Sequence, residues 1–496
     1  MVSEIEDESS FSLLKFISDE GLVASHEEKL RRKDIIDKLK EILMIWIKRV
    51  AYQRRLPHNH IKDTSATILP HGSYGLDVYD AESSIDVLCV GPSFASMEED
   101  FFIVLQNMLL GRPEVSGIHC VKDAKIPLLR FTFEEILIDL SFAKFQIIAV
   151  PENVDIHDPL FVKDIDETSW NSLSGIREMN SILQLVPDVK IFKELLTCVN
   201  TWAKRRGVYS ELFGFFEGIH LAVLTAFICQ KNPSASLGNL LSIFFKTFAF
   251  WPWPEPVVLL EGTTLPPLPP GTRPLMLIQS LSTPDDFCSL NMTSTFNKIR
   301  SEFRRGYRQT EDPFKPQFEW GNLFEPFPYS KSYLRYIKIC LSTYNKDETG
   351  TWVSWVKSRI CSLLAKLEEL HALCDPNPTE YIDTSIGVPN VVFYWGLVPG
   401  RGDKLDLNAV TQDFMEKLGI GYLSNRGRVT LTMVQSSQLP KPLQLASSFI
   451  KELLKPNLNH HQEMIPVCPM HAPHYVGYME TNGSPFELSN GDNLID

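Results

Sequence analysis

Two aspartates in apolar runs, preceded by a Gly-Ser pair, are the residues of this sequence best suited to chemistry. Asp86 and Asp139 each lie in a short β-branched run, and Gly72 and Ser73 come before both. Side chains two positions apart on a strand share a face, so Ser84, Asp86 and an aspartate of a neighbouring strand can converge. Convergent carboxylates repel unless cations lie between them, and two magnesium ions there would assist in-line attack on a nucleotide α-phosphate.

The Gly72-Ser73 pair predicts a turn that binds phosphate. Glycine lets the backbone approach a triphosphate closely, a following helix end favours anions, and Ser73 would add a hydroxyl. The alternative is that Asp86 and Asp139 are strand-end residues bonded to nearby backbone groups. The Gly-Ser pair together with two placed aspartates favours the nucleotide site.

A small α/β unit over 67–149 is predicted to position these residues. Its β-branched runs and one periodic segment predict strands at 86–90, 126–131 and 136–142, with a helix near 98–110. An amphipathic helix is predicted over 27–55, packing on a helical domain.

The rest of the chain alternates helical and mixed patterns. Helices are predicted to dominate 170–250, the proline-rich stretch 251–274 is predicted to be a loop, and 294–308 is predicted to be a basic helix. Beyond residue 328 the pattern predicts an α+β unit with an open sheet. Its expected strands are 333–341, 390–397 and 427–434, and its expected helices are 351–370, 408–418 and 443–454.

Composition restricts the class of protein. A chain of 496 residues is long enough for about two to four domains. Its net charge of -13 gives no general attraction for phosphate backbones, so a nucleic-acid site must be locally basic. Nine scattered cysteines predict free thiols rather than a disulfide framework. No apolar run reaches the roughly 20 residues that span a bilayer, so we expect no membrane partner.

Several stretches beyond the aspartates carry a resemblance to one family. They are 172–177 (SLSGIR), 185–187 (LVP), 202–210 (WAKRRGVYS), 214–219 (GFFEGI), 253–257 (WPEPV) and 291–295 (NMTST). With these stretches in order, the sequence resembles the eukaryotic poly(A) polymerase family of the nucleotidyltransferase superfamily over about residues 12 to 440.

The resemblance implies an α+β multidomain fold with a nucleotidyltransferase mixed-sheet domain, a helical middle domain and an RNA-recognition-motif-like C-terminal domain. The expected boundaries are 12–60 for N-terminal helices packing on the middle domain, 61–155 for the nucleotidyltransferase catalytic domain, 156–325 for the helical middle domain, 326–455 for the RNA-binding domain and 456–496 for a disordered tail.

The resemblance also assigns the metal site. Asp86 and Asp139 match the second and third of three metal-binding aspartates, and are expected to be catalytic, whereas Ser84 stands at the first position. A neutral hydroxyl is a weak magnesium ligand, so the missing carboxylate would lower the rate. Glu82, two residues earlier, is a possible substitute, and its alternative is an exposed turn residue. Asp80 is a poorer candidate.

The nucleotide contacts implied by the resemblance are Gly72, Ser73, Lys204, Tyr209, Gly218 and Ile219. Asn200 stands where the family has a phosphate-binding lysine, and Lys204, one turn later on the same helix face, would take its place. The alternative for Lys204 is a solvated helix charge. His71 and Ser174 replace a family Phe and Asn, which makes selectivity for adenine less secure than the fold.

A basic stripe suggests how RNA would bind. Arg300, Arg304, Arg305 and Arg308 recur along one predicted helix near aromatic residues, a composition suited to phosphates and stacked bases. A solvated charged face is the alternative.

The expected function is template-independent addition of AMP from ATP to RNA 3′ ends, as in mRNA polyadenylation. It would use Mg²⁺ or Mn²⁺, with the RNA 3′ end and 3′-end processing proteins as partners. The family implies the nucleus, but the cytoplasm stays open because the sequence has no basic import tail. The alternatives are an RNA-binding scaffold that has lost catalysis and a transferase of another nucleotide, such as UTP.

Overall fold

The computed structural model describes residues 2–440 except 123, 125, 261–273, 280, 282–286, 313–317, 345–348, 399–404 and 420–426. These residues belong to one compact unit, Met1–Leu454. The helix expected at 443–454 and the tail expected at 456–496 lie outside the described residues.

A five-stranded sheet carries both aspartates. Its strands are β1 (Thr67–His71), β2 (Ile85–Gly91), β3 (Val115–Val121), β4 (Leu128–Phe133) and β5 (Ile136–Lys144), in the order β1-β2-β5-β4-β3. Strands β2 and β5 run parallel, and the other pairs are antiparallel. The expected strands at 86–90 and 136–142 are confirmed, the one at 126–131 is shifted by two residues to form β4, and β1 and β3 were not expected.

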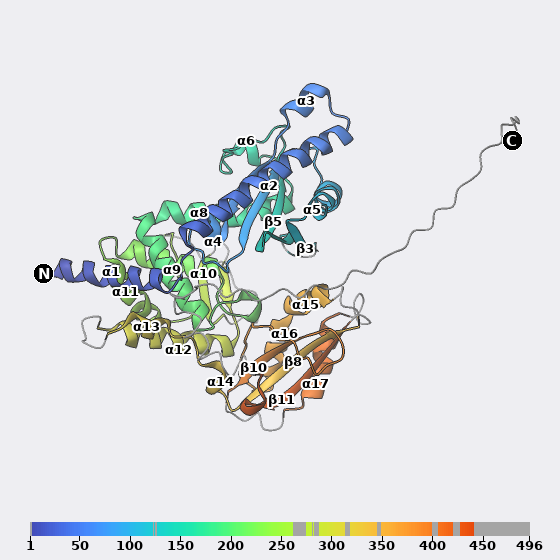
Figure 1. Cartoon of the computed structure of the whole chain (residues 1–496). Coiled ribbons are helices and arrows are strands. Elements are labelled where there is room, and N and C mark those ends of the chain that lie inside the picture. The colour runs from blue at the N-terminus through green and yellow to red at the C-terminus, as the bar shows by residue number, and fades with distance from the viewer. Residues whose placement is uncertain are drawn as a thin grey trace, which may run out of the picture. The chain divides into compact units, whose positions relative to one another are not determined.

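Two N-terminal helices pack in different places. Helix α1 (Val2–Asp19) contacts α11 and α13 of the middle segment. Helix α2 (His26–Gln53), capped by Ser25, instead buries its apolar face in the cluster formed by the sheet, where Trp46 meets Phe142 edge to face at 6.0 Å (Figure 1). The prediction that the N-terminal helices pack on the middle domain is therefore wrong for α2, because its apolar stripe faces the strands.

Smaller helices complete this part of the chain. The expected helix near 98–110 is present as a π-helix, η1 (Met97–Leu105), continued by α5 (Gln106–Leu110). The others are α3 (His58–Asp63), α4 (Gly72–Gly75), α6 (Pro159–Val162) and α7 (Glu167–Ser172).

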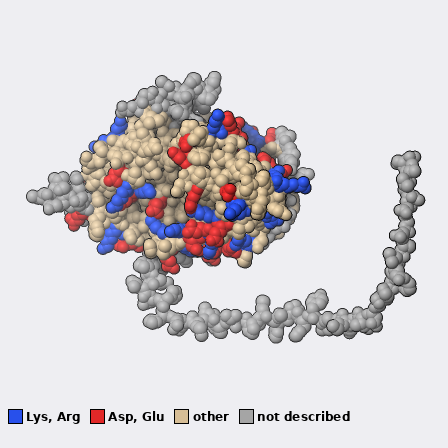
Figure 2. All heavy atoms as spheres, turned by 90° about the horizontal axis from the view of Figure 1, so that it is seen from above, with Lys and Arg blue, Asp and Glu red and all other residues tan. Residues whose placement is uncertain are grey.

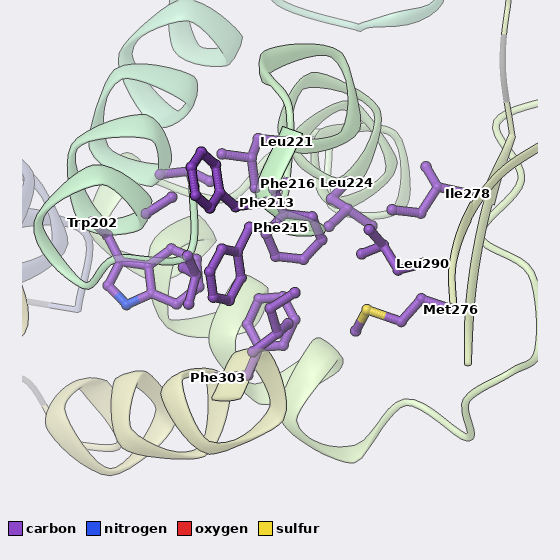
Figure 3. Close-up of a cluster of buried hydrophobic side chains, with 14 of the residues drawn as sticks. Trp202, Phe213, Phe215, Phe216, Leu221, Leu224, Met276, Ile278, Leu290 and Phe303 are labelled. Carbon is purple, nitrogen blue, oxygen red and sulfur yellow. The ribbon is translucent and has the colours of Figure 1, made fainter. Parts of the chain in front are cut away.

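The middle segment is helical, as expected. Its helices are α8 (Ser174–Leu185), α9 (Val189–Arg205), η2 (Glu211–Phe213), α10 (Gly218–Lys231), α11 (Leu237–Phe250), α12 (Thr293–Thr310) and α13 (Trp320–Phe324), with a hairpin of β6 (Met276–Gln279) and β7 (Phe287–Leu290). Its core is aromatic: Trp202 stacks on Phe303 at 5.4 Å, among the side chains in Figure 3. A Cβ at Gly306 would lie 2.2 Å from Phe245, so glycine there allows α12 to approach α11.

The C-terminal segment folds as an antiparallel sheet with helices. Its elements are α14 (Tyr329–Ser332), β8 (Arg335–Thr343), α15 (Thr349–Lys357), α16 (Ile360–Glu369), β9 (Cys374–Asp375), β10 (Asn390–Leu397), α17 (Leu407–Lys417), β11 (Gly427–Gln435) and η5 (Ser436–Gln438). The strand order β11-β8-β10-β9 gives the split βαββαβ arrangement. The helix expected at 351–370 is two helices that meet near Arg359.

The face of this sheet that carries Tyr336 and Tyr394 is covered. Both tyrosines are buried in a cluster with Cys340, Val392 and Leu439, against which Tyr329, Tyr333, Tyr381 and Ile386 also pack. The rings of Tyr336 and Tyr394 are therefore not available for stacking on bases.

The described residues show the state of the cysteines, the lengths of the helices and the distribution of surface charge. As expected, Cys89, Cys120, Cys198, Cys229, Cys340, Cys361 and Cys374 are free thiols, and no helix among the described residues is long and apolar enough to cross a bilayer. The face of the molecule in Figure 2 shows acidic side chains gathered in one patch among basic ones, rather than a continuous basic surface.

Candidate active site

Five polar side chains form a row across the five-stranded sheet. His71 on β1 is paired with Asp86 on β2, which is paired with Asp139 on β5. Asp139 is paired with Arg130 on β4, which is paired with His119 on β3. Residues paired directly across strands point to the same face of a sheet, so the row is contiguous. The predicted convergence of Asp86 and Asp139 is thus met by the register of β2 and β5.

Among the described residues, Asp86 forms no ion pair, unlike Asp139. Its Oδ1 accepts a hydrogen bond from the Ser84 hydroxyl at 3.4 Å. Burial and then the charge of Asp139 raise the pKa of Asp86 to about 6. On its other side lies His71, whose pKa burial lowers to about 4, so that its ring is neutral at pH 7.

The Gly72 backbone lies directly against Asp86. Gly72 has a φ of +61°, and a Cβ there would lie 2.7 Å from the Asp86 Oδ2. Both observations require glycine, because any other side chain would be strained and would collide with the carboxylate. The predicted Gly-Ser turn therefore lies directly beside Asp86, one of the two predicted catalytic aspartates.

Asp139 is held by a guanidinium. Arg130 Nε and Nη2 donate to the two Asp139 carboxylate oxygens, each at 2.7 Å. A paired bidentate contact of this kind is among the stronger charge-assisted hydrogen bonds. The Asp139 side chain is 15% exposed and that of Arg130 is 47% exposed, so the pair is open to solvent on one side only.

The residues present do not form a three-carboxylate centre. Among the described residues, no group of three or more His, Cys, Asp or Glu side chains is placed to hold a metal ion. Ser84 is one residue before β2, and Glu82 is exposed in the turn before it, where its backbone N–H bonds Asp80. Glu82 thus lies outside the strand that carries Asp86, as the exposed turn residue that the alternative predicted. The sheet thus brings together two carboxylates, Asp86 and Asp139, where the family pattern has three, and Arg130 already bonds one of them.

Three of the expected nucleotide contacts, Tyr209, Gly218 and Ile219, lie at or next to the start of α10. A Cβ at Gly218 would lie 3.2 Å from the Tyr209 hydroxyl, so the two residues are in close contact. Burial, followed by the charges of Glu217 and Asp86, raises the pKa of Tyr209 to about 12. Burial, followed by nearby carboxylates that include Asp86, raises the pKa of Glu217 to about 7. Tyr209, Glu217 and Asp86 therefore share one region, and Ile219 follows Gly218 on the same helix.

Lys204 is engaged by a carboxylate of the nucleotidyltransferase segment. Its Nζ lies 2.8 Å from Asp80 Oδ2 and 3.4 Å from Ser83 Oγ, and it lies 5.8 Å from the centre of the Tyr209 ring. Burial would raise the pKa of Asp80, but Lys204 and the bonds from Ser83 lower it below its usual value. Lys204 is exposed on its helix, as the alternative expects, but it also joins α9 to the loop before β2 through this ion pair.

The basic stripe on α12 is only partly free. Arg304 and Arg308 are exposed. Arg305 donates to the carbonyl oxygens of Asn322 and Leu323, the latter at 3.0 Å, and Arg300 lies over the Phe296 ring at 5.3 Å. Of the predicted RNA contacts, Arg305 therefore stabilises the chain after α12, and Arg304 is the exposed one.

Two comparisons with protein families cover most of these elements. The model of the poly(A) polymerase nucleotidyltransferase domain matches residues 2–186, and the model of the poly(A) polymerase central domain matches residues 191–326. The chain belongs to the poly(A) polymerase family. The nucleotidyltransferase-type mixed α+β fold predicted from the sequence is thereby confirmed.

Named relatives of this poly(A) polymerase family member agree. Nuclear poly(A) polymerase 3 of Arabidopsis thaliana is 48% identical over 96% of this chain and 95% of its own length. Nuclear poly(A) polymerase 1 of Arabidopsis is 36% identical over 81% of this chain, and poly(A) polymerase of Dictyostelium discoideum is 33% identical over 83%. The chain spans 59% and 54% of the lengths of these last two relatives.

Solved structures are more distant. A cytoplasmic RNA terminal U-transferase is 16% identical over 64% of this chain and 98% of its own, with a TM-score of 0.44. The polymerase core of TRAMP, an RNA surveillance complex, is 17% identical over 64% and 93%, with a TM-score of 0.42. Similarity at this level adds nothing to the family assignment.

Arg130 is the site residue that reasoning from the sequence missed, although the sequence carries a signal for it. Strands β4 and β5 are joined by the two residues Glu134 and Glu135, so Phe133 pairs with Ile136 and, counting back, Arg130 pairs with Asp139. Both glutamates have positive φ, of 45° and 70°. Tight hairpin turns of this kind favour Asn and Gly, so a Glu-Glu turn is hard to recognise.

Proposed function

We propose that this chain adds AMP from ATP to the 3′ ends of RNA without a template. The observation that carries the proposal is the register that sets Asp86 beside Asp139, next to the Gly72 backbone, in a chain of the poly(A) polymerase family. The names of its relatives support adenylate transfer and the nucleus as its compartment.

Asp86, beside Asp139, would hold a divalent cation, Mg²⁺ or Mn²⁺, which would offset the charge that develops on the α-phosphate. In the proposed reaction the RNA 3′ hydroxyl loses its proton to solvent and its oxygen bonds to the α-phosphorus, while the bond from the α-phosphorus to the leaving pyrophosphate breaks. Gly72 and Ser73 would contact the phosphates, and Tyr209 with Gly218 would form a wall for the base.

The RNA would be guided by residues outside the sheet. We infer that exposed Arg304 and Arg308 contact RNA phosphates. The βαββαβ order of the C-terminal segment supports its interpretation as an RNA-recognition-motif-like domain. Because Tyr336 and Tyr394 are buried, we infer that this domain binds RNA by another surface. Proteins of RNA 3′-end processing are the partners that the family suggests.

Primer extension tests the proposal. The chain is incubated with a short RNA and each of the four nucleotides, with Mg²⁺ and with Mn²⁺. We expect the RNA to lengthen with ATP in preference to the other nucleotides. Absence of product with either metal would contradict adenylate transfer, and a preference for UTP would assign a different nucleotide.

A second candidate is favoured by specific contacts. Ser84 supplies no carboxylate, Asp139 is bonded by Arg130, and Lys204 is bonded by Asp80. These contacts would suit a relative that binds RNA without catalysis. If the wild-type chain does not extend a primer and Ser84→Asp alone does, this second candidate is supported. Extension by the wild-type chain would contradict it.

Asp80 is expected to weaken nucleotide binding. A triphosphate that uses Lys204 must compete with the Asp80 carboxylate, which also repels it. We expect Asp80→Asn to tighten ATP binding by about tenfold, which isothermal titration calorimetry would measure. Asp77→Asn is the matched control, because Asp77 lies in the same loop and bonds Lys29 instead, at 2.8 Å. Unchanged or weaker binding by Asp80→Asn would show that Lys204 does not contact the phosphates.

A further inference from the structure

The row of charges on the catalytic sheet is asymmetric. We propose that Arg130 is a built-in cation that holds Asp139 and leaves Asp86 as the carboxylate that takes a divalent cation, so that the protein itself binds one such ion rather than two. The inference rests on the proposed function, because it concerns the same carboxylate pair.

The pairing of Arg130 with Asp139 is built into the backbone. The two residues are directly opposite each other in the β4–β5 hairpin, whose turn has only two residues. Arg130 lies on the same face as Asp139, while its neighbours Leu129 and Phe131 are buried on the other face. The guanidinium therefore reaches the carboxylate without any change of the main chain. It also occupies both oxygens, which are the atoms that a cation would need.

The charges in the row favour one divalent ion. Within the row, the two carboxylates and the one guanidinium together carry a net charge of minus one. One divalent cation would bring the row to plus one. A second would bring it to plus three on half-buried strands, which Coulomb repulsion makes unfavourable without a bound anion.

Asp86 is the side of the pair open to a cation. The Ser84 hydroxyl at 3.4 Å and the Gly72 backbone lie against it, and neither carries a charge. Lys204, which is also near this region, bonds Asp80. A cation at Asp86 would thus face oxygen atoms on one side and the Asp139–Arg130 pair on the other.

Titration of the full-length protein with Mn²⁺ alone, followed by electron paramagnetic resonance, tests the inference. We expect one ion per wild-type chain. Arg130→Met frees the Asp139 carboxylate and removes a positive charge, so we expect the dissociation constant for Mn²⁺ to fall at least about tenfold. Arg130→Lys keeps the charge and is expected to stay close to the wild type. Arg112→Met is the matched control, since Arg112 pairs with Glu114 in the same segment at 2.8 Å, and its Mn²⁺ affinity should not change.

A double variant shows whether the gain comes from Asp139. In Arg130→Met with Asp139→Asn, the freed carboxylate is gone, and the gain in Mn²⁺ affinity should be lost. Melting curves in EDTA and in Mn²⁺ check the fold, and the Mn²⁺-induced rise in melting temperature should be larger for Arg130→Met than for the wild type. Two ions of equal affinity in the wild type, or no gain in Arg130→Met, would overturn the inference.

The two proposals fail separately. The Mn²⁺ titration contains neither nucleotide nor RNA, so a gain in Arg130→Met supports the role of Arg130 even if no variant extends a primer. Conversely, the wild type could extend a primer while the Mn²⁺ affinity of Arg130→Met is unchanged. That result would support adenylate transfer and contradict the role of Arg130 as a built-in cation.

Discussion

Asp86→Asn is expected to reduce primer extension with ATP by about a thousandfold, because loss of the cation held by this carboxylate removes several kcal/mol of transition-state stabilisation. Asparagine keeps the size of the side chain and can still accept from Ser84, so the local geometry survives. Extension rates at saturating ATP and RNA measure the effect. A loss of less than about tenfold would show that Asp86 is not the main metal ligand.

The same substitution is expected to raise the melting temperature. The pKa of Asp86 in the folded chain is about 6, against an ordinary value of 3.8. The folded chain therefore binds this proton more tightly than the unfolded chain, so stability falls as pH rises from about 4 to about 6. Asparagine cannot ionise, so at pH 7 in EDTA Asp86→Asn should melt at a higher temperature than the wild type, and the difference should vanish below about pH 4.

Asp139→Asn is the matched comparison for stability. It breaks the bidentate contact with Arg130, so we expect it to lower the melting temperature under the same conditions. Opposite shifts for neighbouring aspartates would reflect their different partners. A higher melting temperature for both Asp86→Asn and Asp139→Asn would mean that Arg130 does not stabilise Asp139 in solution.

Elements with strong apolar patterns were predictable from the sequence. Strands β2 and β5 follow β-branched runs and lie within two residues of their predicted bounds, and α2 follows a helical stripe. Strand β3 was missed because Ser116, Gly117 and His119 leave it without an apolar run, and β1 was missed because it is short and contains a proline. Weak patterns of this kind are resolved only by the pairing of strands.

In the candidate site, too, the contacts set by strand pairing were predictable from the sequence, and those set by tertiary packing were not. The convergence of Asp86 and Asp139 follows from the strand pattern, and a two-residue turn would have given the Arg130 pairing. The contact of Lys204 with Asp80 joins residues 124 positions apart, and no local pattern encodes it. What the sequence does not reveal is which charges neutralise one another, since that depends on tertiary packing rather than on propensity.

A buried ion pair that joins the middle and C-terminal segments gives the largest expected loss of stability. Lys298 of α12 bonds both carboxylate oxygens of Asp375 in β9, at 2.8 and 2.6 Å, and the two side chains are 9% and 2% exposed. The Tyr333 hydroxyl also donates to this carboxylate at 2.7 Å, and the Lys298 ammonium lies 4.2 Å from the centre of the Phe327 ring. Asp375 thus depends on Lys298 for its charge balance.

Lys298→Met is therefore expected to destabilise the chain by about 3–5 kcal/mol, because it leaves a buried carboxylate without its counter-ion. Adding Asp375→Asn should recover most of this loss, since the amide is neutral and its oxygen can still accept from Tyr333. Urea denaturation measures both variants. Lys29→Met is the control: its partner Asp77 is 52% exposed, and exposed pairs contribute about 1 kcal/mol or less. If Lys298→Met lowered the free energy of unfolding by no more than Lys29→Met does, burial would not make Asp375 more dependent on its partner. The two segments would then be joined chiefly by their apolar contacts.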